Sequence, residues 1–128
     1  MSASGACPCG SNIPLIQCCL PYHLGQVVPS SAEAVMRSRY TAYVLGDVIY
    51  LKTTWHPQTL PRQFQIQDQM HTQWLGLDIK RHENSDGHHA IVEFVARYKI
   101  KGRAYRLHEV SRFVREEGYW YYLDGTNI

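Results

Sequence analysis

The sequence predicts an α+β protein in which helices precede an antiparallel sheet. Apolar residues recur at helical spacing between positions 30 and 55, whereas from Trp74 onward they alternate with a period of two. Glycine-containing turn signals separate the alternating segments. Helices grouped ahead of the strands, rather than interleaved with them, are typical of α+β folds. We expect the long strands to twist over the helices and to leave a cone with an interior.

The first helix is expected to start with Ser30 as its N-cap, because Glu33 three residues later would complete a capping box. Gly46 is expected to end this helix. A second, shorter helix should continue through Trp55 and stop at the His56-Pro57 pair, since the residue before a proline disfavours helical geometry. The apolar stripe of the first helix consists of Met36, Tyr40, Tyr43 and Val44.

The segment from position 58 to 72 has no clear period, and we expect a loop there with a short helix near positions 67–71. A four-stranded antiparallel meander should follow. Its first strand begins near Trp74 and should place Leu75, Leu77 and Ile79 on one half-buried side. The other strands are expected over residues 89–100, 104–115 and 119–123, with Asp124-Gly125 ending the last one.

All four cysteines of the chain lie near its beginning, as Cys7, Cys9, Cys18 and Cys19. Four thiolates on a short, turn-rich segment are the ligands that a closed tetrahedral Zn²⁺ site requires. Such a segment has little core of its own, so metal binding would supply its folding free energy. We therefore expect residues 1–25 to form a zinc-binding module with these four cysteines as metal ligands. His23 could replace one thiolate, but a surface position is the expectation for it.

Disulfides, free thiols and a redox site are the alternatives for these cysteines. The N-terminus has neither the basic start nor the apolar core of a secretory signal, so we expect a cytoplasmic protein. Cysteines of cytosolic proteins bind metal or react more often than they form disulfides. A redox site usually has a C-x-x-C motif beside a βαβ unit, and this chain has C-x-C instead. Zinc is favoured, with disulfides and free thiols left open.

The composition fits one globular domain with a small appendage. Of the 128 residues, 45% are hydrophobic, which is ample for a core. The 13 basic residues nearly balance the 11 acidic ones, so nucleic-acid binding is not expected. No apolar run approaches the ~20 residues needed to span a bilayer. A basic cluster fits a solvated hairpin tip better than an RNA-binding surface, and it consists of Lys99, Lys101, Arg103 and Arg106.

Two parts of the sequence resemble known families. Cys7-Pro8-Cys9-Gly10-Ser11 through Cys18-Cys19 resembles the SEC-C motif, the zinc-binding tail of the SecA translocation ATPase. Residues 32–43 and 108–125, with the stretches HEVSRF and GYWYYLDG, resemble the bacterial YchJ family of uncharacterised proteins. The resemblance spans nearly the whole chain. It implies a SEC-C zinc module joined to a nuclear-transport-factor-two-like (NTF2-like, also called cystatin-like) α+β cone over residues 30–128.

The loop between the cysteine pairs departs from the SEC-C pattern. The motif usually has a glycine, a lysine and an aromatic residue there, whereas this chain has Asn12, Ile13, Leu15 and Ile16. We expect these apolar residues to pack against the main domain.

Cone folds of this class often hold a polar pocket between the sheet and the helices, and some perform acid/base chemistry there. Alternation along a strand sends His108 and Glu109 to opposite faces, and Glu109 shares its side with apolar residues. We therefore expect Glu109 to face the interior and to pair with Arg37 or Arg39, because a buried carboxylate needs a partner. The residues that could take part in such chemistry are Arg37, Tyr40, Trp55, His56, His108 and Glu109.

We predict a zinc-binding protein without enzymatic activity that acts as a protein-binding or ligand-binding adaptor. The zinc module would contact a protein partner, and the cone would bind a small ligand or pair with another chain. The alternative is a small acid/base enzyme of the isomerase, dehydratase or hydrolase type that uses the cone cavity. No catalytic residue is assigned, and no membrane partner is expected.

Overall fold

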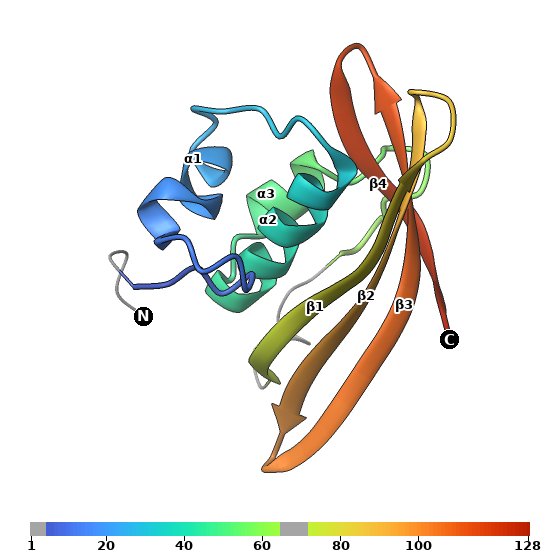
Figure 1. Ribbon diagram of the computed structural model, residues 1–128. Helices are drawn as coiled ribbons and strands as arrows, with labels where there is room; N and C mark the ends of the chain where they lie inside the picture. The colour runs from blue at the N-terminus through green and yellow to red at the C-terminus, as the bar shows by residue number, and fades with distance from the viewer. Residues whose placement is uncertain (1–4, 65–71) are drawn as a thin grey trace.

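The computed structural model describes residues 5–64 and 72–128 (Figure 1). A 3-10 helix, η1 (Leu15–Gln17), is followed by three α-helices: the short α1 (Cys19–His23), the long α2 (Ala32–Leu45) and the short α3 (Val48–Thr53). Four strands follow: β1 (Thr72–Asn84), β2 (His89–Ile100), β3 (Arg103–Glu116) and β4 (Tyr119–Asn127). They pair antiparallel in chain order, so the predicted α+β class and meander are confirmed. The helix expected at 67–71 lies outside the described residues.

The elements form three layers with α2 in the middle (Figure 1). The curved sheet lies along one side of α2, and the cysteine segment with α1 lies against the other side. Helix α2 contacts β1, β2 and β4, so a single helix joins the cysteine segment to the sheet. None of the helices in the described residues is long and apolar enough to cross a membrane.

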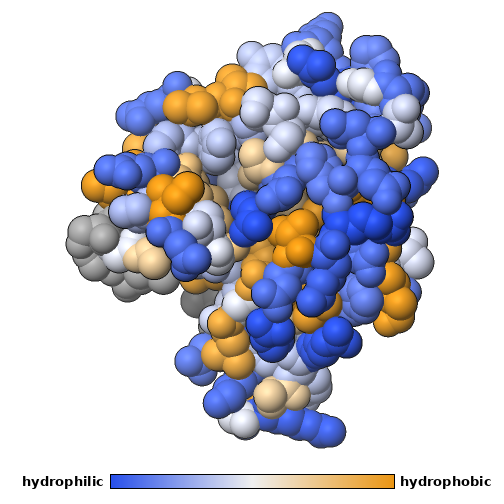
Figure 2. Space-filling view, viewed as in Figure 1, coloured by the Kyte–Doolittle hydropathy of each residue, from blue (hydrophilic) through white to orange (hydrophobic). Residues whose placement is uncertain are grey.

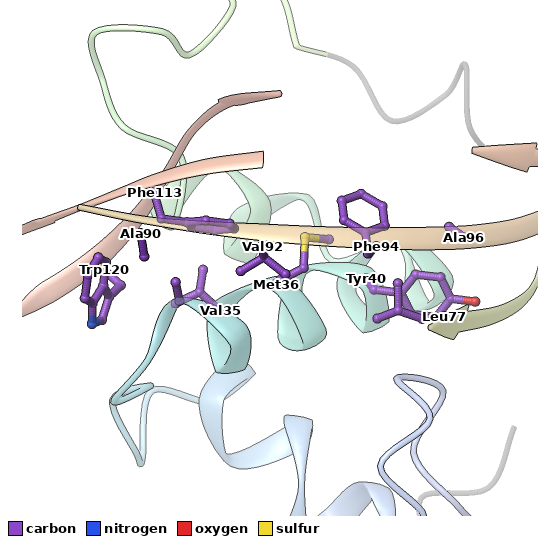
Figure 3. Close-up of a cluster of buried hydrophobic side chains, with 11 residues drawn as sticks. Val35, Met36, Tyr40, Leu77, Ala90, Val92, Phe94, Ala96, Phe113 and Trp120 are labelled. Carbon is purple, nitrogen blue, oxygen red and sulfur yellow. The ribbon is translucent and has the colours of Figure 1, made fainter. Parts of the chain in front are cut away.

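The main core lies between α2 and the concave face of the sheet (Figure 3). Val35, Met36 and Tyr40 of α2 point toward the sheet, as the predicted apolar stripe requires. Full burial of each such side chain contributes about 1.5–3 kcal/mol to folding. The sheet contributes Leu77, Ala90, Val92, Phe94, Ala96, Phe113 and Trp120.

The start of α2 differs by one residue from the prediction. Ser31, not Ser30, is the N-cap, and its hydroxyl accepts a hydrogen bond from the Ala34 N–H at 3.1 Å. The register of a capping box is therefore lost, and the Glu33 carboxylate instead accepts a hydrogen bond from Arg37 at 3.0 Å. Gly46 ends the helix in the left-handed region with φ 78°, as expected.

The second helix is shorter than predicted, because the last strand captures the residues after it. Helix α3 ends at Thr53, and Trp55 forms a parallel bridge to Tyr122 of β4. The His56 N–H donates to the Tyr122 carbonyl at 2.8 Å, and the Tyr122 N–H donates to the Thr54 carbonyl at 2.8 Å. These backbone bonds replace the helical ones that would have extended α3 to Pro57.

A bulge near the start of β1 overturns the predicted alternation there. Trp74 pairs with Tyr98 and Gly76 with the adjacent Arg97, so Leu75 is an extra residue without a partner. As a result Leu75 is 47% exposed, whereas Leu77 is buried. The prediction that Leu75 shares the half-buried side of Leu77 is therefore wrong.

Strand β4 continues past the predicted stop at Asp124-Gly125. Asp124 pairs with Arg112 of β3, and its carboxylate accepts two hydrogen bonds from the Arg112 guanidinium at 2.6 and 2.5 Å. Gly125 also pairs with β3, and the strand ends at Asn127, opposite Glu109. Because of this extension, β4 lies beside β3 as far as Glu109.

Candidate metal centre and ligand cavity

The four cysteines meet at one point, and their sulfur atoms all lie within 4.8 Å of one another. The Cys18 sulfur is 3.6 Å from that of Cys9 and 3.9 Å from that of Cys19. A tetrahedral zinc ion with Zn–S bonds of about 2.3 Å holds its sulfurs about 3.8 Å apart. All four thiols are free, and these distances far exceed a disulfide bond of about 2.05 Å. The geometry fits a four-thiolate metal site, and the identity of the metal stays a prediction.

Tight turns bring the cysteine pairs together. The Cys7 N–H donates to the Ile13 carbonyl at 2.9 Å, which closes the loop that carries Cys7 and Cys9. Within this loop Gly10 has φ 83°, and a Cβ there would lie 3.1 Å from the Leu77 carbonyl of β1. The position therefore requires glycine both for its backbone angle and for the close approach of the loop to the sheet.

The environment shifts the pKa values of two of the thiols in opposite directions. Burial raises the pKa of the Cys18 thiol to about 11. Hydrogen bonds from Cys19 and Cys7 lower the pKa of Cys9, so the protons are shared unevenly among the sulfurs. A metal ion bound by four thiolates would displace the protons that these sulfurs carry.

Hydroxyl groups supply hydrogen bonds to the sulfurs. The Thr41 hydroxyl of α2 donates to the Cys19 sulfur at 3.3 Å and lies 3.5 Å from the Cys7 sulfur. The Ser11 hydroxyl lies 3.1 Å from the Cys18 sulfur. Because a divalent ion with four thiolates carries a net charge of −2, such donors stabilise the site and tune its metal affinity.

Arg37 contacts the cysteine segment and not Glu109. Its guanidinium donates to the Cys9 carbonyl at 2.7 Å and to the Glu33 carboxylate at 3.0 Å. The prediction that Arg37 pairs with Glu109 is therefore wrong, because Arg37 lies on the face of α2 that meets the cysteine segment.

His23 is neither a fourth ligand nor a surface residue. Its side chain is 4% exposed, and its Nε2 atom lies 2.8 Å from the Ser38 carbonyl. Its ring packs on Tyr50 with the centroids 4.5 Å apart, and Nδ1 is 3.6 Å from the Asp47 carboxylate. His23 thus packs α1 against α2 and α3. It is not part of the group of candidate metal ligands.

The apolar loop of the cysteine segment packs only in part. Leu15 is buried among the cysteines, whereas Ile13 and Ile16 are 44% and 48% exposed. Figure 2 shows apolar side chains on this side of the molecule, where the cysteine segment and the following linker lie. The expectation that the isoleucines pack against the main domain is therefore wrong.

A cavity of about 380 Å³ lies between α2 and the concave face of the sheet. Most of its wall is apolar, and Arg39, Thr72, Glu109 and Ser111 add polar groups to those of its aromatic residues. Its aromatic lining consists of Tyr40, Tyr43, Trp74, Phe94, Tyr98 and Tyr122. A cavity of this size, with few polar groups in an apolar wall, is typical of small-molecule sites.

Glu109 faces this cavity, as predicted, but not with the predicted partner. Its Oε2 atom accepts a hydrogen bond from the Ser111 hydroxyl at 2.6 Å, and Ser111 is fully buried. The carboxylate rests in the space that Gly125 leaves open, where a Cβ would collide with it. Among the ion pairs of the described residues, none joins Glu109 to Arg37 or to Arg39.

Arg39, which is 2% exposed, is held by other groups. Its Nη1 donates to the Leu51 carbonyl at 2.8 Å and to the Thr54 hydroxyl at 2.9 Å. Its guanidinium carbon lies 4.9 Å from the centre of the Trp55 ring and 4.5 Å from that of Tyr122. Two hydrogen bonds from Nη1 and two aromatic rings therefore hold this cation at the cavity wall.

The other predicted chemistry-bearing residues are scattered. Tyr40 lines the cavity, whereas Trp55 and His56 are not among its described lining residues. His56 binds Glu116 at 2.9 Å, and His108 binds Glu93 at 2.7 Å on the opposite face of β3. The cavity residues that the sequence did not assign as site residues are Tyr43, Trp74, Tyr98, Ser111 and Tyr122. Ser111 could have been found from the sequence, because it lies two positions after Glu109 on the same strand and therefore faces the same side.

Tyr40 and Tyr122 of the cavity wall are neutral at physiological pH. Burial raises the pKa of Tyr40 and of Tyr122 to about 12. Their phenol groups therefore present rings and hydroxyls to a ligand and add no negative charge to that of Glu109.

Comparison with known proteins places this arrangement in a family. Residues 31–125 match the family described as YchJ, middle NTF2-like domain. A UPF0225 protein of Ralstonia nicotianae is 53% identical, over 95% of this chain and 91% of the relative. A UPF0225 protein of Cupriavidus pinatubonensis is 52% identical, over 95% of this chain and 88% of the relative.

Two solved structures share the fold. The solution structure of a SEC-C motif containing protein from Rhodopseudomonas palustris has a TM-score of 0.84 at 31% identity, covering 95% of this chain and 98% of that one. The crystal structure of a SEC-C motif containing protein from Psychrobacter arcticus has a TM-score of 0.78 at 31% identity, covering 98% and 84%. The chain therefore belongs to the UPF0225 family and carries its YchJ-type NTF2-like domain behind a SEC-C-like cysteine cluster.

Proposed function

We propose that this protein is a zinc-stabilised, ligand-binding protein of the cytosol without enzymatic activity. The observation that carries the proposal is the cavity of about 380 Å³. It holds a carboxylate, Glu109, that is fixed by Ser111 and has no cation paired with it among the described residues. A polar group that is held in place within an apolar cavity is what orients a small ligand.

The zinc ion would be structural. Four cysteine ligands leave no open coordination position for a substrate or a water molecule. Cys7, Cys9, Cys18 and Cys19 would hold the ion, and Thr41 would connect it to α2. The metal would thereby keep the cysteine segment folded against the helix that forms one wall of the cavity.

Metal analysis tests the zinc part of the proposal. We expect about one equivalent of zinc per chain under reducing conditions, because one four-ligand set binds one ion. A variant with Cys18→Ser and Cys19→Ser should lose the metal. Less than about half an equivalent in the wild-type protein would refute a zinc site of this kind.

A fragment screen by NMR tests the cavity. Ligands should shift the indole N–H resonance of Trp74, which lines the cavity. Leu107→Trp should abolish these shifts by filling the cavity, since Leu107 is part of its wall. The matched control is Leu75→Trp, which places the same side chain on the exposed bulge and should leave binding intact. If no fragment of a broad set shifts Trp74, the ligand-binding proposal fails.

Acid/base catalysis is the second candidate, favoured by the free carboxylate of Glu109 alone. A general base must lie within hydrogen-bond reach of the proton that it removes, and a ligand in the cavity could provide one. Turnover that disappears in Glu109→Gln, while ligand binding persists, would decide for an enzyme.

A protein partner of the zinc module remains part of the proposal. Ile13 and Ile16 support it, because they are exposed apolar residues on the module. A partner isolated with the zinc-loaded protein should be lost on Ile13→Ser with Ile16→Ser and retained on Leu75→Ser. Equal loss in both variants would show that the contact is not specific to the module.

A further inference from the structure

The cavity presents a negative charge that no ion pair among residues 5–64 and 72–128 neutralises. Glu109 lies at the middle of β3, and its Oε2 atom is occupied by the Ser111 hydroxyl at 2.6 Å. None of the hydrogen bonds of the described residues reaches the second carboxylate oxygen, Oε1, and this atom is not fully buried. A ligand that donates a hydrogen bond could therefore reach it.

The chain is shaped to hold the carboxylate in this position. Gly125 on β4 leaves the space that the carboxylate occupies, and any Cβ at that position would overlap it. The buried Ser111 hydroxyl fixes one of its oxygens. A side chain restrained from two sides loses little freedom when a ligand binds, which favours affinity.

The nearby cation, Arg39, is already engaged through its Nη1 atom. Arg39 already donates to Leu51 and Thr54, and it stacks between Trp55 and Tyr122. An anionic ligand that approached the other nitrogens of Arg39 would also meet the charge of Glu109, which lines the same cavity. A neutral apolar ligand would leave the carboxylate without a partner in a largely apolar cavity, which is costly.

The remaining wall suits a positive charge. Trp74 is the centre of an aromatic group: its ring lies 5.6 Å from Tyr40, 5.9 Å from Tyr43 and 5.4 Å from Tyr98, measured between centroids. All four rings line the cavity. The faces of such rings attract ammonium groups, and the apolar wall accommodates a hydrocarbon body.

We propose that the cavity binds an organic cation, an amine with an apolar body whose ammonium group donates to Glu109. This inference rests on the proposed ligand-binding function and names the chemical class of the ligand. The Glu109 carboxylate would accept a hydrogen bond from the ammonium group, and Ser111 would hold that carboxylate in place. Trp74 and its neighbouring tyrosines would surround the apolar part of the ligand.

Three probes with the same body separate the possibilities: 4-phenylbutylamine, 4-phenylbutanol and 4-phenylbutyrate, which are cationic, neutral and anionic at neutral pH. Binding to the zinc-loaded protein is measured by calorimetry and by the Trp74 indole resonance. We expect the amine to bind at least about tenfold more tightly than the alcohol, and the acid to bind most weakly. In Glu109→Gln the preference for the amine over the alcohol should fall to about twofold or less.

The matched control is Glu93→Gln, which removes a carboxylate from the opposite face of the sheet, where Glu93 binds His108 and Arg81. It should leave the preference unchanged. Equal or tighter binding of the alcohol or the acid to the wild-type protein would overturn the inference, while the cavity would still be a ligand site. Absence of binding by all three probes would also overturn it, and the proposed function would fall only if the fragment screen failed as well.

Discussion

The substitution Gly125→Ala tests how Glu109 is held. Gly125 of β4 pairs with Ser111 of β3 and is diagonal to Glu109, and its backbone angles are open to any residue, so only sterics oppose an alanine. The new Cβ would overlap the Glu109 carboxylate, which must then swing away into the cavity. This movement breaks the hydrogen bond from the fully buried Ser111 hydroxyl.

The cost follows from that one contact. Loss of a hydrogen bond to a charged group costs about 1.5–3 kcal/mol. The lower chain entropy of alanine in the unfolded state returns about 0.4–1 kcal/mol. We therefore expect the free energy of unfolding to fall by about 1–2 kcal/mol, which lowers the melting temperature by several degrees in a protein of this size.

Equilibrium urea denaturation of the reduced, zinc-saturated protein measures this change. In a Glu109→Ala background the same glycine substitution should be neutral or slightly stabilising, which gives a coupling energy of about 1 kcal/mol or more. Gly76→Ala is the matched control, because its Cβ would lie 3.7 Å from the Arg97 guanidinium, an ordinary contact. An equal loss of stability from Gly125→Ala with and without Glu109 would refute the reasoning.

Three further outcomes are expected. Thr41→Val removes the donor to the Cys19 sulfur and should weaken zinc binding by about fivefold to tenfold in a competition with a chromophoric chelator, while Thr41→Ser should retain it. Arg39→Met should lower the free energy of unfolding by about 3 kcal/mol in urea denaturation, since two buried carbonyl and hydroxyl acceptors lose their donor. Arg112 lowers the pKa of the Asp124 carboxyl, so their interaction stabilises the fold above the unfolded-state pKa and is lost as pH falls through the folded-state pKa. Arg112→Gln should raise the pKa of Asp124 toward its ordinary value in an NMR titration, and its effect on stability should vanish in acid.

The sequence predicted the elements that depend on local pattern. The stripe of Met36 and Tyr40, the stop at Gly46 and the meander of strands all follow from periodicity and turn residues, and the structure has them. The clustering of the cysteines likewise follows from their closeness along the chain. In each case the deciding interactions join residues that are near one another in sequence.

The errors arise where the local pattern is ambiguous or where distant segments decide. Two adjacent serines can each cap α2, and the local pattern alone could not select Ser31 over Ser30. Trp55 leaves the helix because β4, far along the chain, supplies backbone partners to it. The bulge at Leu75 adds one residue to β1, a change that alternation cannot reveal.

The site was predicted in parts for the same reason. Alternation along β3 placed Glu109 in the interior, but helical geometry did not show which arginine of α2 lies near it. Arg37 and Arg39 are two positions apart and therefore point to different sides of the helix. Arg37 reaches the cysteine segment, and Arg39 reaches Trp55, so neither pairs with Glu109.

The position of α2 has a consequence for the order in which the protein is built during synthesis. The four cysteines and the helix that supports them all precede the first strand, so they leave the ribosome before any residue of the sheet. A metal ion could bind at that stage, and the metal-bound cysteine segment would then already hold one side of α2. The strands would then close over the free side of the helix, and the cavity would exist only after β4 had joined β3.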